Sequence, residues 1–381
     1  MFKKFGIFNK IKDISIIGIS SYIGSGINAL FYFYFATFLE KSDYGELGYF
    51  LALGTFGHAI ANIGIYETVV VYGAKKENIL PLGYGFSLIT GGVVAVVIYF
   101  WFQSIPVSLF IFSLLIFTVM QADFISKKKY TLFSISDILR RVLGVILAFA
   151  LYPLWGIDGA VLGFAIGSIF SFYKLIIFLK DQKLSLSCLK EKFSFMIQTY
   201  SRGINMFLFI AADKIMIGEV FGFTILGSYS LAFQYILLLT VLPRALNFYL
   251  VPQESQGAKN SKLKTYAIIF AIGIALLSVI ISPFLINLVF PEFNEIVLVV
   301  QIMGFGVIPM TIFTINESIF LGKEKSELVL ICNIVQVSTY FVAIIVLGTK
   351  FGLLGLGIAF LIATSIAAIL SVALKIKLKT E

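Results

Sequence analysis

The sequence predicts an all-α polytopic membrane protein, and two observations support this fold class. Of the 381 residues, 59% are hydrophobic and only 13% are charged, with a mean hydropathy of +1.00. A soluble domain of this length is much more polar. Apolar stretches recur along the whole chain, and each is long enough to cross a hydrocarbon core of about 30 Å as a helix of about 20 residues.

The apolar stretches predict about 12 transmembrane helices. A basic flank precedes the first stretch, but this stretch is too long for a signal-peptide core and no small-x-small cleavage site follows it, so it is expected to stay as a span. We expect the spans at residues 14–38, 47–71, 80–102, 105–123, 132–153, 159–179, 196–218, 227–251, 264–290, 296–320, 328–348 and 353–374.

The positions of Lys and Arg predict the orientation of the chain. Most of the 29 basic residues lie in the two tails and in every second loop, whereas the alternate loops hold only Lys41 and Lys350. The positive-inside rule therefore places both termini in the cytoplasm, with the chain as a multi-pass protein of the plasma membrane. This topology and the anionic headgroups of membrane lipids account for the net charge of +9, so nucleic-acid binding is a poor interpretation of it.

The chain consists of two related halves. FISKKKYTLFSISD at 124–137 aligns with FLGKEKSELVLICN at 320–333, and the same spacing of 196 residues brings Gly156 and Gly159 onto Gly352 and Gly355. We therefore expect two six-helix bundles, 1–180 and 196–381, joined by a cytoplasmic linker at 181–195. Six spans per half is an even number, so the bundles are related by a pseudo-twofold axis along the membrane normal, with a substrate path between them.

Polar residues follow one face of four predicted helices, the first two spans of each half. Such a face is not expected toward lipid, where its hydrogen-bonding groups have no partner, so the four faces predict one central cavity. The alternative is that these residues only join helices. The residues that we take as substrate-binding candidates on or beside these faces are Asn28, Asn62, Arg202, Asn205, Asp213, Lys214, Arg244 and Asn247.

Five basic residues lie inside predicted spans: Arg140, Arg141, Arg202, Lys214 and Arg244. A guanidinium group presents a planar fork that suits phosphate or carboxylate, so Arg202 and Arg244 predict capture of an anionic headgroup. Asp137 precedes Arg141 by four residues, a spacing that predicts a structural ion pair on one helix. Lys214 is turned about 100° from Asp213 and is expected to reach the outer interface, while Asp213 finds a partner inside.

Two titratable residues inside spans are candidates for binding a coupling ion, either H⁺ or Na⁺. His58 lies on an interior face, where a packed and hydrogen-bonded histidine is the alternative; its ordinary pKa near 6.5 permits proton transfer. Glu317 lies deep in the tenth span, where the other half has Gln121, and a buried hydrogen-bonded acid is the alternative there.

The run ADKIMIGEVFGFTILGSYSLAFQ at 212–234, with its acid-base pair and Leu-Gly-x-Tyr-x-x-Ala, resembles the start of the second half of polysaccharide flippases. Pro252 and Tyr44-Gly45 strengthen the resemblance. These are O-antigen-type exporters of the multidrug/oligosaccharidyl-lipid/polysaccharide superfamily. The resemblance implies alternating access and a polyprenyl or dolichyl (pyro)phosphate oligosaccharide, moved from the inner to the outer leaflet without a cofactor. It implies phosphate contacts from Arg202 and Arg244, and it allows a glycan polymerase or glycosyltransferases as partners.

The nearest alternative is a cation-coupled exporter of the multidrug and toxin extrusion type, which favours a carboxylate in the first span; none lies there beyond the ends. A major-facilitator transporter is disfavoured because GAKKEN, after the second span, lacks the expected acidic and arginine-rich signature. The sequence contains no paired carboxylates, His-rich cluster or phosphate-binding glycine loop, so it favours a transporter over an enzyme. Cys188 and Cys332 indicate neither a disulfide nor a metal site.

Overall fold

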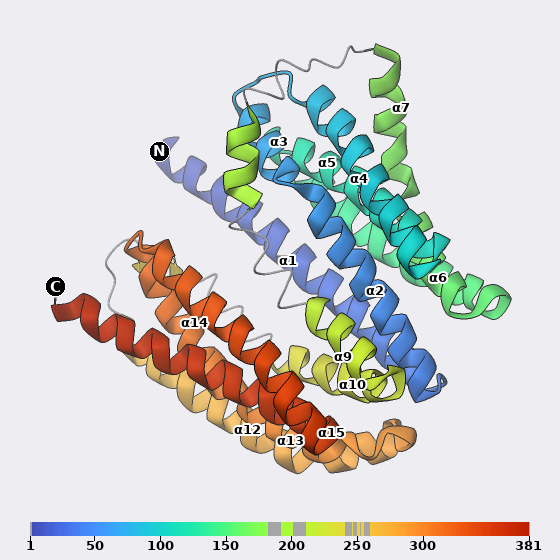
Figure 1. Ribbon diagram of the computed structural model, residues 1–381. Helices are drawn as coiled ribbons and strands as arrows, with labels where there is room; N and C mark the ends of the chain where they lie inside the picture. Colours follow the sequence, from blue (N-terminus) through green and yellow to red (C-terminus); the bar gives the residue numbers. More distant parts are fainter. Residues whose placement is uncertain are drawn as a thin grey trace. The chain divides into compact units, whose positions relative to one another are not determined.

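The computed structural model describes residues 2–181, 192–200, 211–240, 246, 250–251, 253–254 and 260–380. These residues are helical apart from short connections and form no β-strand, which confirms the predicted all-α class. The α-helices labelled in Figure 1 are α1 (Phe2–Ala36), α2 (Lys41–Asn62), α3 (Ile65–Ala74), α4 (Leu80–Phe102), α5 (Ile105–Ser126), α6 (Tyr130–Gly167), α7 (Phe172–Asp181), α9 (Asp213–Phe221), α10 (Phe223–Leu239), α12 (Ser261–Val289), α13 (Ile296–Phe305), α14 (Val307–Gly322) and α15 (Ser326–Thr380). Two short 3₁₀ helices, η1 (Ile169–Ser171) and η3 (Pro291–Phe293), precede α7 and α13.

Six helices of the described part are long and apolar enough to cross a membrane, or seven if the bent pair α2 and α3 counts as one span. The chain is therefore a multi-pass membrane protein. Two of the six, Tyr130–Ile177 and Ser326–Leu378, are 48 and 53 residues long. Each is longer than the roughly 20 residues that one crossing needs. The total of 12 spans stays a prediction.

Helices α6 and α15 both turn back on themselves at a glycine. The backbone leaves the helical conformation at Trp155 and Gly156 in α6 and at Gly352 in α15. In α6, a Cβ on Gly163 would lie 2.3 Å from Ala148 N, and one on Gly167 would lie 2.6 Å from Gly144 N. The two arms therefore run antiparallel in close contact, and the turns fall where the sequence predicts breaks between spans.

The turns of the two halves repeat at the predicted spacing of 196 residues. Gly156 has φ 59° and ψ −139°, and Gly352 has φ 57° and ψ −134°, a conformation that only glycine adopts readily. Lys128 and Glu324 also share a positive φ, of 56° and 61°. These matched backbone turns support the predicted duplication, since neither is required by a generic helical hairpin.

The second predicted span is bent. Helices α2 and α3 meet at an angle of 49° at Ile63 and Gly64, both of which have positive φ. The helical segment 192–200 packs on this bend, because a Cβ on Gly64 would lie 2.2 Å from Met196 O. The span predicted at 47–71 is therefore not one continuous helix, which corrects the expectation from the sequence.

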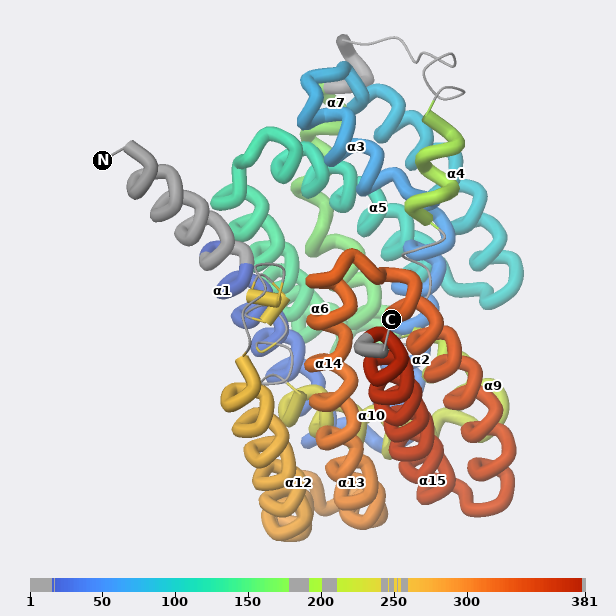
Figure 2. Tube along the Cα trace, turned by 90° about the vertical axis from the view of Figure 1, so that its left-hand side faces the viewer, coloured from blue at the N-terminus to red at the C-terminus, as the bar shows by residue number. Residues whose placement is uncertain are grey.

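The chain forms two compact units: unit 1 comprises Met1–Phe31 and Tyr49–Ala212, and unit 2 comprises Tyr32–Gly48 and Asp213–Glu381. In unit 1, α5 is central and contacts α3, α4, α6 and α7 (Figure 1). In unit 2, α13 contacts α10, α12 and α15, and α14 lies along α15 (Figure 2). The predicted bundle limits 1–180 and 196–381, the linker 181–195 and the shared axis stay predictions, and residues 182–191 lie outside the described part.

Candidate functional site

Four predicted substrate-binding residues lie outside the described part of the chain: Arg202, Asn205, Arg244 and Asn247. The pair of arginines proposed to bind phosphate therefore stays a prediction. The other candidates are described, and they fall on α1, α2, α9 and α14.

The polar face predicted on the first span borders the contact between α1 and α6. Ser21 and Ser25 are exposed and Asn28 is half-buried. The neighbouring face of α1 packs on α6, where Ser20 Oγ donates to Ser134 Oγ at 2.9 Å and the Phe31 ring meets Phe164 edge-on. The polar residues Ser21, Ser25 and Asn28 are therefore not buried in the contact between α1 and α6. Residues that line a chamber have to be accessible in this way.

His58 and Asn62 of α2 both have protein partners. His58 is buried, and its Nε2 lies 2.9 Å from Thr118 Oγ1 on α5. Because Thr118 Oγ1 already donates to Leu114 O at 2.8 Å, it accepts a hydrogen bond from the Nε2–H of His58. Asn62 Oδ1 accepts from Tyr66 N at 3.4 Å, at the start of α3. These contacts favour packing and capping, and the coupling and substrate roles of the two residues stay predictions.

Arg140 and Arg141 of α6 share one carboxylate, as the spacing predicts. Arg141 Nε lies 2.9 Å from Asp137 Oδ2, and Arg140 NH2 lies 3.4 Å from Asp137 Oδ1. The Arg140 guanidinium lies over the Phe117 ring, 5.0 Å from its centroid. The predicted structural ion pair is therefore confirmed, but it joins two positive charges to one negative charge.

Asp213, at the start of α9, is fully buried and has three hydrogen bonds. Its Oδ2 accepts from Tyr229 Oη at 2.7 Å, and its Oδ1 accepts from Lys214 N at 2.8 Å and from Lys214 Nζ at 3.3 Å. The Tyr229 hydroxyl also contacts the Tyr340 hydroxyl on α15. A buried carboxylate is stable only when it is paired and hydrogen-bonded, and this one is saturated.

Lys214 departs from its predicted direction. Its ammonium turns back to Asp213 and lies 4.4 Å from the centroid of the Phe233 ring, and the side chain is only 13% exposed. The Coulomb attraction of the buried carboxylate outweighs hydration at the interface, because the local dielectric is low. Within unit 2, Asp213 and Lys214 therefore tie three helices together, and their role as substrate ligands stays a prediction.

The glycines of the family-like motif bring the first turn of α2 against α10. A Cβ on Gly45 would lie 1.9 Å from Phe223 O, and a Cβ on Gly227 would lie 2.0 Å from Lys41 O. Tyr44, next to Gly45, is fully buried against the Phe293 ring. This contact explains physically why Tyr-Gly and Leu-Gly-x-Tyr occur together, since any side chain at either glycine would separate the two helices.

An ion pair that was not predicted from the sequence lies beside the contact between α2 and α10. Lys41 Nζ lies 2.7 Å from Glu295 Oε1, and Ser228 Oγ donates to the same oxygen at 2.7 Å. Partial burial alone would raise the pKa of Glu295, but the bonds from Lys41 and Ser228 outweigh it and hold the pKa below the usual 4.5. The partners are 254 residues apart, so no local pattern signals the pair.

Glu317 of α14 is half-buried and adjoins a polar network between α14 and α15. The neighbouring Asn316 donates from Nδ2 to Ser371 Oγ at 2.9 Å, and its Oδ1 accepts from Lys375 Nζ at 3.0 Å. Cys332 is buried and lies within electrostatic range of Glu317. The role of Glu317 as a coupling-ion site stays a prediction.

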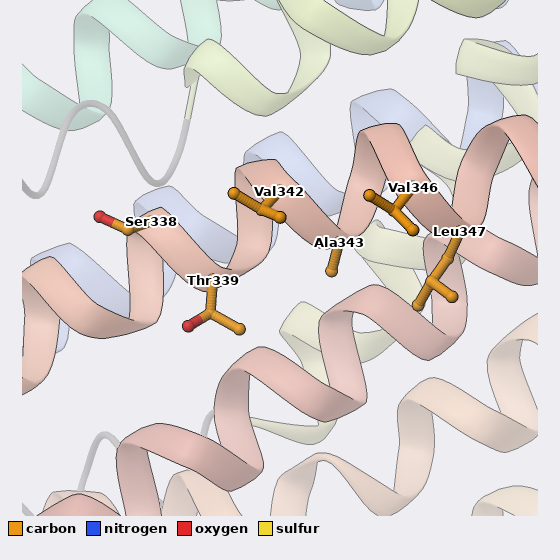
Figure 3. Close-up of a pocket in the computed structure, with 6 residues that line it drawn as sticks. All are labelled: Ser338, Thr339, Val342, Ala343, Val346 and Leu347. Carbon is orange, nitrogen blue, oxygen red and sulfur yellow. The ribbon is translucent and has the colours of Figure 1, made fainter.

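Two open cavities lie on apolar helix surfaces of the described part. One, of about 490 Å³, is lined by Val96, Val97, Phe100 and Trp101 of α4. The other, of about 480 Å³, follows successive turns of the first arm of α15 and includes the hydroxyl groups of Ser338 and Thr339 (Figure 3). Neither brings a charged group to its surface, and no three His, Cys, Asp or Glu residues of the described part gather as metal ligands.

One comparison with known proteins identifies a family, and another identifies a shared fold. The sequence profile of the family described as "Polysaccharide biosynthesis protein" matches residues 35–262, more than half of the chain. No curated protein sequence matches significantly. A structure titled "Lipid II flippase MurJ, inward closed conformation" is 16% identical, with 95% of this chain and 87% of that chain covered and a TM-score of 0.69.

Exporters of another branch share the fold as well. An inward-facing multidrug resistance MATE family transporter of the MOP superfamily is 15% identical, with 97% of this chain and 98% of that chain covered and a TM-score of 0.69. The Vibrio cholerae MATE transporter VcmN in its bent form is 16% identical over 96% of this chain and 97% of that chain, with a TM-score of 0.54. The fold is therefore common to flippases and drug exporters and does not by itself choose between them.

Proposed function

Since this chain belongs to the polysaccharide biosynthesis protein family, we propose that it is a flippase for a lipid-linked oligosaccharide. The substrate is carried on a polyprenyl or dolichyl (pyro)phosphate and moves from the inner to the outer leaflet of the plasma membrane, with both termini in the cytoplasm. The match of the family profile to residues 35–262 carries the proposal. The fold shared with a protein titled a lipid II flippase supports it.

In this proposal, the protein works by alternating access without a cofactor. The polar faces of α1 and α2 line part of a water-accessible chamber, and Arg202 and Arg244 bind the phosphate while the lipid tail stays in the bilayer. Opening toward the outside requires Lys41 to separate from Glu295. Glycosyltransferases that build the oligosaccharide or a glycan polymerase that extends it are the expected partners.

A cation-coupled drug exporter is the second candidate. The fold match to a MATE transporter favours it, because the coverage and TM-score are as high as for the flippase. Glu317 on α14 is then the candidate site for H⁺ or Na⁺, with His58 as the other titratable group. The predicted first span has no carboxylate between residues 14 and 38, and this speaks against a cationic drug as substrate.

Transport in proteoliposomes tests the first function. The purified full chain is reconstituted with a fluorescent polyprenyl diphosphate oligosaccharide, and the externally exposed sugar is measured with a membrane-impermeant lectin. We expect the double variant Arg202→Ala/Arg244→Ala to lose export while inserting normally, because each arginine contributes a charge-assisted bond to the phosphate. Lys350→Ala, which removes one exposed charge beside the turn of α15, is the matched control.

Export at the wild-type rate by the double variant would exclude the arginine pair as the phosphate site. Export of a cationic dye but not of the lipid-linked sugar by the wild-type protein would exclude the flippase and favour the drug exporter. Transport that is independent of both pH and sodium would exclude Glu317 and His58 as coupling residues.

A further inference from the structure

The charged cluster of α6 in unit 1 is not electrically balanced. Asp137 is the one carboxylate that contacts the Arg140 and Arg141 side chains within the described part of the chain. His58 lies within electrostatic range of Arg140 and supplies no negative charge. The cluster therefore carries a net charge of about +1 in a place where an uncompensated charge is costly.

The two guanidinium groups also have more donors than partners. A guanidinium group carries five N–H donors, and among the described residues this pair makes three hydrogen bonds, two to Asp137 and one from Arg141 Nη1 to Gly24 O at 3.4 Å. Arg140 Nε is buried and has no hydrogen-bond partner in the described part of the chain. A buried donor without a partner costs free energy, so the site is better satisfied when an acceptor from outside the chain is bound.

The cluster lies against α1, where a glycine makes room for it. A Cβ on Gly24 would lie 2.6 Å from Arg141 Nε, so an added methyl group would require the flexible Arg141 side chain to shift from its place on the helix. Asn28 follows Gly24 by one helical turn, which places Arg141 beside the polar face of α1. The Arg140 and Arg141 side chains are 15% and 21% exposed, so the cluster is enclosed but reachable.

The depth of the cluster fits a ligand that enters the membrane. Arg140 is the tenth residue after Tyr130, where α6 begins, which corresponds to about 15 Å along the helix axis. With the span predicted at 132–153, the cluster lies inside the hydrocarbon core, where bulk headgroups do not lie and an anion has to be carried in.

We propose that Arg140 and Arg141 form an anion subsite in unit 1 that binds the phosphate or pyrophosphate group of the transported lipid. The inference rests on the proposed function and adds to it a binding position separate from Arg202 and Arg244. Paired guanidinium forks match phosphate oxygens in bidentate geometry. Asp137 contacts both arginines and competes with the ligand, so release is possible as well as capture.

Binding of farnesyl diphosphate to the purified full chain in neutral detergent tests the subsite. Arg141→Gln and Arg140→Gln are each expected to weaken binding about tenfold or more, the loss typical of one charge-assisted hydrogen bond. Asp137→Asn is expected to tighten binding, because it removes the competing carboxylate and raises the net charge. Misfolding would weaken binding and not tighten it, so a gain of affinity in Asp137→Asn distinguishes a change in the subsite from a loss of the fold.

A glycine pair gives a matched geometric control. Gly24→Ala is expected to weaken binding by displacing the Arg141 guanidinium with no change of charge. Gly18→Ala on the same helix, where an added Cβ meets nothing within 4 Å, is expected to bind as the wild type does. Lys350→Gln controls for the loss of one positive charge at an exposed position.

Three further ligands separate the sources of the phosphate. Inorganic pyrophosphate is expected to compete weakly and farnesol not at all, whereas displacement of farnesyl diphosphate by phosphatidylglycerol would overturn the assignment in favour of bulk anionic lipid. Unchanged affinity in Asp137→Asn and in both arginine variants, with export of the lipid-linked sugar by the wild type, would overturn the subsite and leave the flippase standing. A wild-type protein that neither binds farnesyl diphosphate nor exports the sugar would overturn both.

Discussion

In unit 2 the buried carboxylate of Asp213 is saturated by Tyr229 and by the backbone and ammonium of Lys214, whereas in unit 1 Asp137 serves two guanidinium groups at once. The first cluster is neutral and complete, and the second is positive and has spare donors. A neutral, saturated cluster has nothing left to offer a ligand and holds helices together. An unbalanced one is tolerated where a ligand supplies the missing charge.

The equivalent helices of the two halves, α5 and α6 in unit 1 and α14 and α15 in unit 2, share backbone turns but differ in their polar side chains. The turns at Lys128 and Glu324 and at Gly156 and Gly352 repeat at a spacing of 196 residues. Polar positions of α5 and α6 differ from their counterparts of α14 and α15 at this spacing: Gln121 corresponds to Glu317, Asp137 to Asn333 and Arg140 to Gln336. Unit 1 thus has the positive cluster where unit 2 has the neutral Asn333 and Gln336, and unit 2 has the acid Glu317 where unit 1 has Gln121, which suits an anionic substrate and a cationic coupling ion in different units.

The largest expected effect comes from breaking the neutral cluster. Asp213→Ala leaves the Lys214 ammonium buried without its carboxylate, and we expect it to lower the free energy of unfolding by about 3–5 kcal/mol. Thermal unfolding of the purified protein in detergent, followed by tryptophan fluorescence, measures the loss. The double variant Asp213→Ala/Lys214→Met removes both charges and is expected to recover much of the stability.

An Asp213→Ala protein as stable as the wild type would show that the cluster is not structural. The contrast between a structural cluster in unit 2 and a ligand-binding cluster in unit 1 would then be lost, because ligand binding would be the remaining role for Asp213. The corresponding change in unit 1, Asp137→Asn, is expected to have a smaller effect on stability, since its side chain is 17% exposed and water reaches the arginines.

The second largest expected effect tests whether the hairpins of α6 and α15 depend equally on close backbone packing at a glycine. A Cβ on Gly159 would lie 2.2 Å from Leu151 O, and a Cβ on Gly355 would lie 2.0 Å from Leu347 O, again at equivalent places. Gly159→Val and Gly355→Val are therefore each expected to cost about 1–3 kcal/mol of stability, and by similar amounts. Gly92→Ala, where an added Cβ meets nothing within 4 Å, is the control and is expected to unfold as the wild type does. A large loss in one unit only would contradict the structural equivalence of the hairpins.

The spacing of residues along the sequence predicts much of the fold but few of the contacts in the candidate site. The run lengths predict where α6 and α15 turn, and the i,i+4 spacing predicts the pair of Asp137 and Arg141, because both follow from the period of one helix. The Tyr229 hydroxyl that binds Asp213 lies 16 residues away on α10, and its other partner, Tyr340 on α15, lies a further 111 residues away, so tertiary packing alone brings them together. For the same reason Lys214, placed at the interface from its position near a span end, instead turns toward a carboxylate.

The smallest expected effect concerns the exposed ion pair of Lys41 and Glu295, a third way of holding charge. The two side chains are 27% and 42% exposed, so the pair contributes only about 0.2–1 kcal/mol. Because the folded-state pKa of Glu295 is lower than the usual 4.5, this contribution is fully present above pH 4.5 and is lost as the pH falls through the lowered value.

The unfolding temperature of Glu295→Gln, compared with that of the wild type between about pH 7 and about pH 3, measures the contribution of the ion pair to stability. We expect the difference to vanish at the acid end, whereas Glu292→Gln, an exposed acid of the same turn, is expected to show no such pH-dependent difference. A difference that persists at low pH would mean that the Glu295 contact depends on packing and not on charge, and the pair would then resemble the saturated cluster of Asp213 more than a releasable closure.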